Sequence, residues 1–462
     1  MSFARYPNYK DSGVEWLGEV PGHWGVSALK RGFDVALGKM LQPEATNPDD
    51  ELLPYLRAAN VKWKGIDSTE IKQMWISKRD RTQLKLKYGD LLISEGGDVG
   101  RSCLWEAELE ECYFQNSVNR VRARNGYSNR YLYYWMSTIK DKGYIDVLCN
   151  KSTIAHFTAE KVSAVPTPLP PAQEQTQIAA FLGRETAKID GLVAEQRRLM
   201  VLLKEKRQAV ISHAVTRGLN PDATMKPSGI EWLGDVPAHW DVSAIKRYAV
   251  KITDGAHVSP ETENGVFDFI STKDVGTDSI DFENCLRTSK LSYESMVKTG
   301  CRPLVGDVLF SKDGTIGRTV VILEDRDFVV ASSLIIIRPT ANILDSKFLN
   351  CLCQSQGIAN QVECFVKGAG LPRLSIQNLT KVVGCFPPLS EQKAIAAFLA
   401  TESSKFDTLT TEAQRAIDLL QERRTALISA VVTGQIDVRD VRADIPPARD
   451  SKRQSAVRSA RT

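Results

Sequence analysis

A long stretch of this sequence occurs twice. Residues 12 to 31 read SGVEWLGEVPGHWGVSALKR and residues 228 to 247 read SGIEWLGDVPAHWDVSAIKR, with 15 of the 20 aligned positions identical. The two copies begin 216 residues apart in a chain of 462 residues. Solenoid and propeller repeats have periods of about 20 to 50 residues, so a period this long indicates a tandem duplication of a complete folding unit.

Three shorter motifs recur in the same order in both halves. They are GDLLISEGGDVGR at 89–101 with GDVLFSKDGTIGR at 306–318, LPPAQEQTQIAAFL at 169–182 with FPPLSEQKAIAAFL at 386–399, and LLKEKRQAVIS at 202–212 with LLQERRTALIS at 419–429. The common order predicts that both halves share one architecture.

Each half changes character partway along. Residues 26 to 168 hold short runs of β-branched and aromatic residues interrupted by Gly, Asn and Asp, which predicts strands and loops. After Pro170 and Pro171 the apolar residues recur at steps of four and three, which is typical of a coiled-coil helix. Proline suits the first turn of a helix, because its missing N–H would be unpaired there. The pattern predicts helices of about 37 residues, each spanning roughly 55 Å.

The two expected helices carry the same apolar seam, and we expect them to pack together antiparallel, because the intervening domain must return the chain. The alternative is that they are unrelated core helices of two separate domains. The expected seam or partner-binding residues are Ile178, Leu182, Ile189, Leu192, Leu199, Leu203, Ile395, Leu399, Phe406, Leu409, Leu420 and Leu427.

The expected fold is therefore α+β, with two pseudo-symmetric strand-rich domains separated by two long helices packed as an antiparallel coiled coil. The expected segments are a lead segment at 1–25, a first strand-rich domain at 26–168, a central helical region at 169–220, a second domain with the repeated lead at 221–386, a C-terminal helical region at 387–438, and a basic, disordered tail at 439–462. In a cyclic arrangement of two units, residues 12–31 should lie near 431–437, as residues 228–247 lie near 214–220.

The sequence carries no convincing catalytic or metal signature. The loops at 89–101 and 306–318 lack the GK[ST] ending of a phosphate-binding loop and are expected to be glycine-containing hairpins. Nine cysteines without a CxxC pair and five scattered histidines do not form a zinc set. The spacing of Asp49, Glu70 and Lys72 leaves a metal-dependent nuclease open as a rival. No apolar run is long enough to span a membrane, and the opening residues MSFARYPNYKDSG lack the apolar region of a signal peptide, so the expected compartment is the cytoplasm.

Basic and aromatic residues alternate in the first domain. Residues 57 to 87 hold nine basic and three acidic residues beside Trp63, Trp75 and Tyr88, although the whole chain has a net charge of only +4. Such local patches suit contacts with DNA phosphates. The candidate DNA-binding residues are Arg57, Lys62, Lys64, Arg79, Arg81, Lys85, Arg101, Arg120, Thr253, Asp254, His257, Lys273, Lys312, Arg318, Lys367 and Arg373.

The order of the GxEWLGxVPxHW lead, a variable domain with GDxLxS…GxxGR, the PPxxEQxxIAxFL helix start and a repeat of all three resembles the specificity subunit of type I restriction-modification enzymes. The resemblance covers essentially the whole chain apart from the tail. It implies a non-catalytic subunit whose two target recognition domains bind a bipartite, asymmetric site in double-stranded DNA. It also implies antiparallel helices that recruit two adenine methyltransferase (M) subunits and, through them, restriction (R) subunits.

In this family S-adenosylmethionine, ATP and Mg are used by the partner subunits, and none is expected to be bound by this chain. The stretch ITDGAHVSP at 252–260 also resembles a recurrent loop of the target recognition domains. The first half has VALGKMLQP at 35–43 instead. A two-headed coiled-coil adaptor that binds protein or carbohydrate is the other rival.

Overall fold

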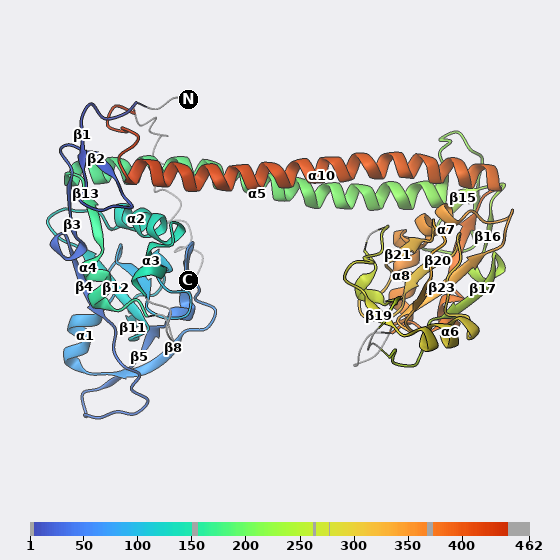
Figure 1. The fold of residues 1–462 in the computed structure, drawn as a ribbon, viewed down its shortest axis with the longest axis horizontal. Coiled ribbons are helices and arrows are strands. Elements are labelled where there is room, and N and C mark those ends of the chain that lie inside the picture. Colours follow the sequence, from blue (N-terminus) through green and yellow to red (C-terminus); the bar gives the residue numbers. More distant parts are fainter. Residues whose placement is uncertain (1–3, 150–155, 262–264, 277, 367–372, 442–462) are drawn as a thin grey trace, which may run out of the picture. The chain divides into compact units, whose positions relative to one another are not determined.

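A computed structural model of the protein describes residues 4–149, 156–261, 265–276, 278–366 and 373–441. The chain divides into two compact units. Unit 1 comprises residues 1–195 and 416–462, and unit 2 comprises residues 196–415. There are two long helices, α5 (Ala172–Arg217) and α10 (Leu389–Val432) (Figure 1). Each helix has one part in unit 1 and the other part in unit 2. Most of the expected tail lies outside the described residues.

Unit 1 contains a four-stranded sheet in the order β10-β9-β12-β4 and a three-stranded sheet in the order β11-β5-β8. The strands of the unit are β1 (Tyr9–Asp11), β2 (Glu19–Pro21), β3 (Gly25–Ala28), β4 (Phe33–Leu37), β5 (Glu51–Leu56), β6 (Val61–Lys62), β7 (Gly65–Ile66), β8 (Lys72–Ile76), β9 (Leu91–Ser94), β10 (Ser102–Leu104), β11 (Tyr113–Phe114), β12 (Val118–Ala123) and β13 (Pro166–Leu169). Its shorter helices are η1 (Leu29–Arg31), η2 (Ala58–Asn60), α1 (Lys78–Leu84), α2 (Asn129–Asp141), α3 (Tyr144–Leu148) and α4 (Ala159–Ala164).

Unit 2 repeats this topology. Its four-stranded sheet has the order β21-β20-β23-β17 and its three-stranded sheet the order β22-β18-β19, so the sheets of the two units correspond strand by strand. The strands are β14 (Met225–Pro227), β15 (Asp235–Pro237), β16 (Asp241–Ala244), β17 (Ala249–Asp254), β18 (Phe267–Ile270), β19 (Leu286–Thr288), β20 (Val308–Ser311), β21 (Thr319–Val321), β22 (Phe328–Val330), β23 (Leu334–Pro339) and β24 (Val383–Phe386). The helices are η3 (Ile245–Arg247), η4 (Thr272–Asp274), α6 (Lys290–Lys298), α7 (Ser346–Cys353), α8 (Gln356–Phe365) and α9 (Ile376–Leu379).

The repeated lead segment lies against the end of a long helix in each unit, as predicted. In unit 1 the buried Trp24 belongs to the same core as Val431, and the Tyr9 hydroxyl donates to the Gly434 carbonyl at 2.9 Å. In unit 2 the buried Trp240 shares a core with Val215. The expected proximity of residues 12–31 to 431–437, and of 228–247 to 214–220, is confirmed.

The glutamate of each PPxxEQ motif holds the His-Trp pair of its unit. In unit 1 Glu174 accepts from Trp24 Nε1 at 3.0 Å and contacts His23 Nε2 at 2.8 Å. In unit 2 Glu391 accepts from Trp240 Nε1 at 3.1 Å and contacts His239 Nε2 at 2.7 Å. The two repeated motifs, distant in sequence, therefore form one junction in each unit.

The long helices pack against each other and run antiparallel (Figure 1). In unit 2 Arg207 donates to Asp407 at 2.6 Å, and in unit 1 Arg424 donates to Asp190 at 3.1 Å. With 46 and 44 residues, α5 and α10 are both longer than the expected 37.

The seam of this coiled coil differs from the prediction at three positions. Leu192, Leu199 and Leu409 have 52%, 41% and 44% of their surface exposed, so their assignment to the seam was wrong. From Ile189, steps of four and three lead to 193, 196 and 200, and Val193 is the buried residue. The other predicted positions are buried or partly buried, namely Ile178, Leu182, Ile189, Leu203, Ile395, Leu399, Phe406, Leu420 and Leu427.

No helix in the described part of the chain combines the length and apolar character needed to cross a membrane.

Candidate nucleic-acid interface

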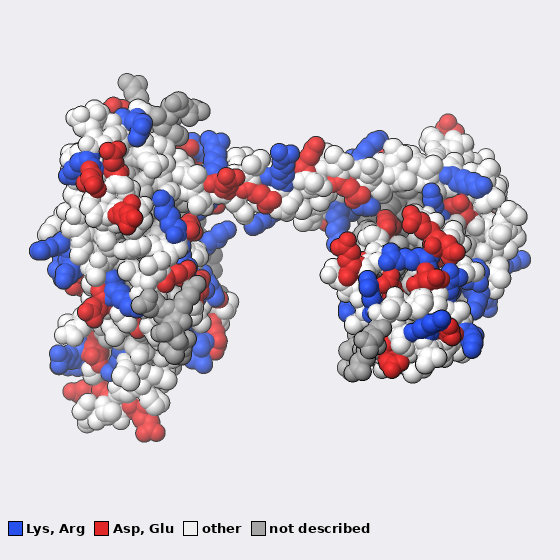
Figure 2. Space-filling view, viewed as in Figure 1, with Lys and Arg blue, Asp and Glu red and all other residues white. Residues whose placement is uncertain are grey.

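The predicted basic patch of unit 1 is largely balanced by carboxylates. Arg57 pairs with Glu70 at 2.7 Å, and Arg81 pairs with Glu51. Lys62 and Lys85 lie 3.9 and 3.4 Å from the carboxylates of Asp67 and Glu111, respectively. The face seen in Figure 2 accordingly shows basic and acidic side chains interspersed, with no single basic area. Exposed ion pairs contribute little to stability, so a DNA phosphate could replace these carboxylates at small cost.

Two predicted cations of unit 1 remain available. Lys64 and Arg79 are exposed, and neither has an ion-pair partner within 4 Å among the described residues. Their role in DNA binding stays a prediction.

Arg120 was wrongly predicted to contact DNA. Only 4% of the residue is exposed, and its guanidinium donates to Asp34 at 2.9 Å and to the Gln83 carbonyl at 3.0 Å. Burial lowers the pKa of Arg120. The equivalent position on β23 is Ile336, which is also buried, so this is an interior position of the sheet.

The GxxGR motifs are hairpin loops, as expected. The loops join β9 to β10 and β20 to β21, and the glycines before each arginine, Gly100 and Gly317, have φ of 81° and 91°. Arg101 donates to the Ala58 carbonyl at 2.9 Å, and Arg318 donates to the Val275 carbonyl at 3.0 Å. Both arginines therefore fasten the hairpin to the neighbouring short 3-10 helix, and phosphate contacts by their remaining N–H groups stay a prediction.

Lys312 was also wrongly placed at the DNA surface. Its side chain is 5% exposed, and its ammonium lies 2.5 Å from Asp254, which also contacts His257 Nε2 at 2.8 Å. Burial raises the pKa of Asp254, but the contacts with Lys312 and His257 outweigh burial and hold this pKa below its ordinary value. His257 stays 63% exposed in its side chain, while Thr253 is partly buried in β17.

The remaining predicted residues of unit 2 lie on its surface or outside the described residues. Lys273 is exposed on η4. Arg373 is exposed and pairs with Asp313 at 3.0 Å. Lys367 lies outside the described residues. DNA contact by Lys273 and Arg373 stays a prediction.

Two of the three residues of the nuclease pattern, Glu70 and Lys72, take part in ion pairs. Glu70 accepts from Arg57 at 2.7 Å and lies 3.6 Å from Lys72, and the side chains of Glu70 and Lys72 are 67% and 50% exposed. The described residues hold no group of three or more His, Cys, Asp or Glu side chains that could hold a metal ion.

The loops that follow β4 and β17 begin in the same way. A Cβ atom on Gly38 would lie 2.2 Å from the Gln115 carbonyl oxygen, and a Cβ on Gly255 would lie 2.1 Å from that of Val330. Both positions therefore require glycine. The stretch VALGKMLQP is the structural counterpart of ITDGAHVSP, although the two share few residues.

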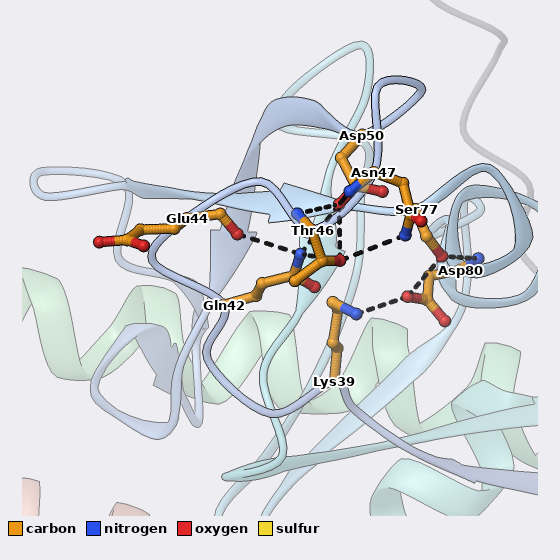
Figure 3. Close-up of polar contacts among 8 residues, drawn as sticks. All are labelled: Lys39, Gln42, Glu44, Thr46, Asn47, Asp50, Ser77 and Asp80. Carbon is orange, nitrogen blue, oxygen red and sulfur yellow. Dashed lines mark hydrogen bonds and ion pairs between the residues drawn. The ribbon is translucent and has the colours of Figure 1, made fainter.

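The loop of unit 1, residues 38–50, is held at both ends by polar contacts (Figure 3). Lys39 pairs with Asp80 of α1 at 2.6 Å. At the far end, Asp50 accepts from the backbone N–H groups of Thr46 and Asn47 at 2.8 and 3.1 Å. The backbone hydrogen bond from Thr46 is the largest influence that holds the pKa of Asp50 below its ordinary value.

Comparison with known proteins gives the same picture of two related halves. The family model described as "Type I restriction modification DNA specificity domain" matches residues 21–195 and 241–418. The chain belongs to this family. It is a DNA specificity protein and not an enzyme.

Relatives and solved structures agree. A Haemophilus influenzae protein named as a type I restriction enzyme specificity subunit is 28% identical over 338 residues, which cover 72% of this chain and 78% of the relative. The type I restriction enzyme MjaVIII specificity subunit of Methanocaldococcus jannaschii is 22% identical and covers 96% of this chain and 99% of its own. A structure described as the basis of complex assembly and conformational transition of the type I R-M system has a TM-score of 0.66 at 16% identity, covering 89% of this chain and 98% of that one.

The two specificity domains differ in charge at an equivalent position that the sequence analysis missed. Glu95 of unit 1 follows the last residue of β9, as Lys312 follows the last residue of β20. The Oε2 atom of Glu95 is buried and has no hydrogen-bond partner among the described residues, and burial raises its pKa despite the opposing charge of His156 at 3.8 Å. Aligning the two GxxGR motifs by their serines and arginines would have revealed this reversal.

Proposed function

We propose that the two specificity domains bind the two halves of a bipartite, asymmetric site in double-stranded DNA. The observation that carries this proposal is the contrast between a shared scaffold and divergent side chains at equivalent surface positions. In the loops that follow β4 and β17, the exposed Met40 and Leu41 stand where unit 2 has the exposed His257 and Val258. Two domains with the same sheets and different surface chemistry suit two different half-sites, because base edges are distinguished by donor, acceptor and apolar groups.

The near-identical junctions support a second part of the proposal. The chain recruits two copies of an adenine methyltransferase subunit and, through them, restriction subunits. A partner that binds the same feature twice requires the same residues twice, and the lead segments and helix starts are the parts that both halves share. S-adenosylmethionine, ATP and Mg then belong to the partner subunits. The complex acts in the cytoplasm, where it meets the DNA.

Methylation mapping tests the proposal. A host that carries this gene with a neighbouring methyltransferase gene should methylate adenines in one bipartite motif with two different halves. Exchanging residues 26–168 for the equivalent domain of a relative should change one half of that motif and leave the other half and the number of bound methyltransferase subunits, measured by native mass spectrometry, unchanged. A change in both halves would contradict the assignment of one half-site to each domain.

A further inference from the structure

The loop 38–50 of unit 1 exposes two large apolar side chains next to each other. Met40 is 75% exposed and Leu41 is 52% exposed. Leu37, at the end of β4 just before the loop, is 46% exposed. Each side chain forgoes on the order of 1 to 2 kcal/mol of burial in this state. Scattered single apolar residues are common on protein surfaces, whereas contiguous exposed apolar patches mark interaction sites.

The loop that carries this pair is rigidly held. The ammonium of Lys39 is fixed by Asp80, and the Trp75 N–H of β8 donates to the Gln42 carbonyl at 3.0 Å. Asp50 also accepts from the Gln42 side chain at 3.0 Å (Figure 3). Met40 and Leu41 lie between these anchors. Because the loop is ordered in advance, a ligand that covers the two side chains pays little conformational entropy.

Unit 2 exposes side chains at the equivalent place. His257 and Val258 occupy the positions of Met40 and Leu41, counted from the obligatory glycines Gly38 and Gly255. The side chain of His257 is 63% exposed, and Val258 is 72% exposed. An anchor is present here too, since Asp254 holds His257. Both domains therefore expose two adjacent side chains after the glycine, next to a residue held by a carboxylate, although their sequences differ elsewhere.

The exposed cations Lys78 and Arg79 beside the loop favour a nucleic acid over a protein as the ligand, although the loop itself also carries the exposed Glu44 and Asp49. The first turn of α1 contains Asp80, the partner of Lys39, and also the exposed Lys78 and Arg79. Arg81 of the same helix donates to the Asp49 carbonyl in the loop at 3.1 Å. Cations beside an apolar tip match the alternation of phosphates and bases along a DNA groove.

We propose that Met40 and Leu41 make apolar contacts with bases of the half-site bound by unit 1, and that His257 and Val258 occupy the corresponding place in the half-site bound by unit 2. The contact is with the thymine methyl group or the base faces in the groove, while Lys78 and Arg79 contact the phosphates. This inference rests on the proposed DNA-binding function. It assigns base contact to side chains without charge, which a search for basic residues overlooks.

Binding of labelled DNA by the full chain in complex with its methyltransferase subunits tests the inference. The probes are a fluorescein-labelled duplex that carries the methylation-mapped site and a scrambled duplex of the same length, each titrated over a series of salt concentrations. The variants are M40A/L41A, the conservative M40L/L41M, K78A/R79A, and V147A, which shortens an exposed apolar side chain of α3 as the matched control.

M40A/L41A should lose between about 10- and 100-fold in affinity for the mapped site, with unchanged affinity for the scrambled duplex and an unchanged salt slope. M40L/L41M should keep most of the affinity, and V147A all of it. K78A/R79A should weaken binding to both duplexes and flatten the salt dependence, because phosphate contacts are lost.

Other results would overturn the inference. Wild-type affinity of M40A/L41A for the mapped site would exclude a base contact, and equal losses on both duplexes would indicate a general disturbance of the loop. Loss of the methyltransferase subunits from M40A/L41A on size-exclusion chromatography would assign the pair to a protein interface. A wild-type complex that does not distinguish the two duplexes would overturn the proposed function itself, and the inference with it.

Discussion

Replacing Glu174 by alanine should destabilise unit 1 far more than the equivalent replacement of Glu391 destabilises unit 2. Only 6% of the Glu174 side chain is exposed, and its Oε1 accepts from Trp24 Nε1 and from the Tyr6 hydroxyl at 2.7 Å. Burial and the bond to Glu174 raise the pKa of Tyr6, so its hydroxyl stays protonated and needs an acceptor. Each buried donor left without an acceptor costs about 1 to 3 kcal/mol, so E174A should cost about 2 to 6 kcal/mol.

Unit 2 offers a matched comparison. The side chain of Glu391 is 28% exposed and accepts from one buried donor, Trp240 Nε1. Its other partner, His239, has a side chain that is 53% exposed and can bind water instead. We therefore expect E391A to cost about 1 to 3 kcal/mol. E174Q keeps an oxygen in place for Trp24 and should cost about 1 kcal/mol, from the loss of charge assistance.

Hydrogen exchange with mass spectrometry in graded urea is the suitable assay, because a chain of two units need not unfold in one step and each unit needs its own free energy of opening. Peptides from β9 and β12 report on unit 1, and peptides from β20 and β23 report on unit 2. The reasoning is refuted if E174A lowers the opening free energy of unit 1 no more than E391A lowers that of unit 2. It is also refuted if E174Q is as damaging as E174A.

Three further outcomes follow from single contacts in unit 1. G38A should lower the free energy of unfolding by about 1 to 3 kcal/mol, because its Cβ would meet the Gln115 carbonyl. G191A lies on an open face of α5 and should raise the free energy of unfolding by about 0.5 to 1 kcal/mol. Thermal melts of both variants check the opposite signs. R122M leaves the Asp90 carboxylate, which is 2% exposed, without its bidentate partner, so the free energy of unfolding measured in urea should fall by about 3 to 5 kcal/mol. A fall of less than about 1 kcal/mol would contradict the role of this pair. E95Q should stabilise unit 1 at neutral pH, because the raised pKa of Glu95 makes the folded state bind more protons than the unfolded state. The free energy of unfolding of the wild type therefore falls as the pH rises from the ordinary glutamate pKa of about 4.3 to the raised value. The corresponding profile of E95Q, measured by urea unfolding over the same pH range, should lack that fall.

The sequence allowed the architecture to be predicted because the duplication supplies internal evidence. The motif with Trp24 could be matched to the motif with Trp240, and chain closure of two equal units then places each against the end of a long helix. Proline before Ala172 and glycine after Arg217 marked the ends of the first helix, and α5 begins and ends at those residues. These features depend on local sequence and on chain connectivity, so no side-chain geometry was needed to predict them.

The seam of the coiled coil shows where this reasoning failed. Leu192 and Leu199 follow from alternating steps of four and three counted from Ile178, whereas the buried Val193 lies a second step of four after Ile189. The burial of a helical residue is decided by its angular position on the helix and only secondarily by its type. Strict alternation of four and three from the buried Ile178 leads to Leu192 and Leu199, so the spacing rule alone did not find the observed seam.

The DNA-binding residues were the least predictable part, because the availability of a cation depends on partners distant in sequence. Arg120 meets Asp34 across the sheet, and Lys312 meets Asp254 from another strand. The sequence around Arg120 or Lys312 does not indicate that these carboxylates lie close to them in the fold. A count of charges in a sequence window therefore overestimates the basic surface, and here it also drew attention away from the uncharged Met40.

The repeat itself separates structural residues from candidates for DNA contact. Three pairs of polar residues that are identical in both halves have intramolecular partners in both units: Glu174 and Glu391 hold the His-Trp pair, the buried Asp90 and Asp307 each hold an arginine, and Arg101 and Arg318 each donate to a backbone carbonyl. The identity of these three pairs is explained by folding, which both units need equally. A residue that distinguishes one half-site from the other must differ between the halves, and it must be exposed. Met40 with His257, and Leu41 with Val258, meet both conditions, whereas Lys312 differs from Glu95 but is buried. The search for DNA-reading residues should therefore begin where the repeat breaks down on the surface, whatever the charge of the side chains found there.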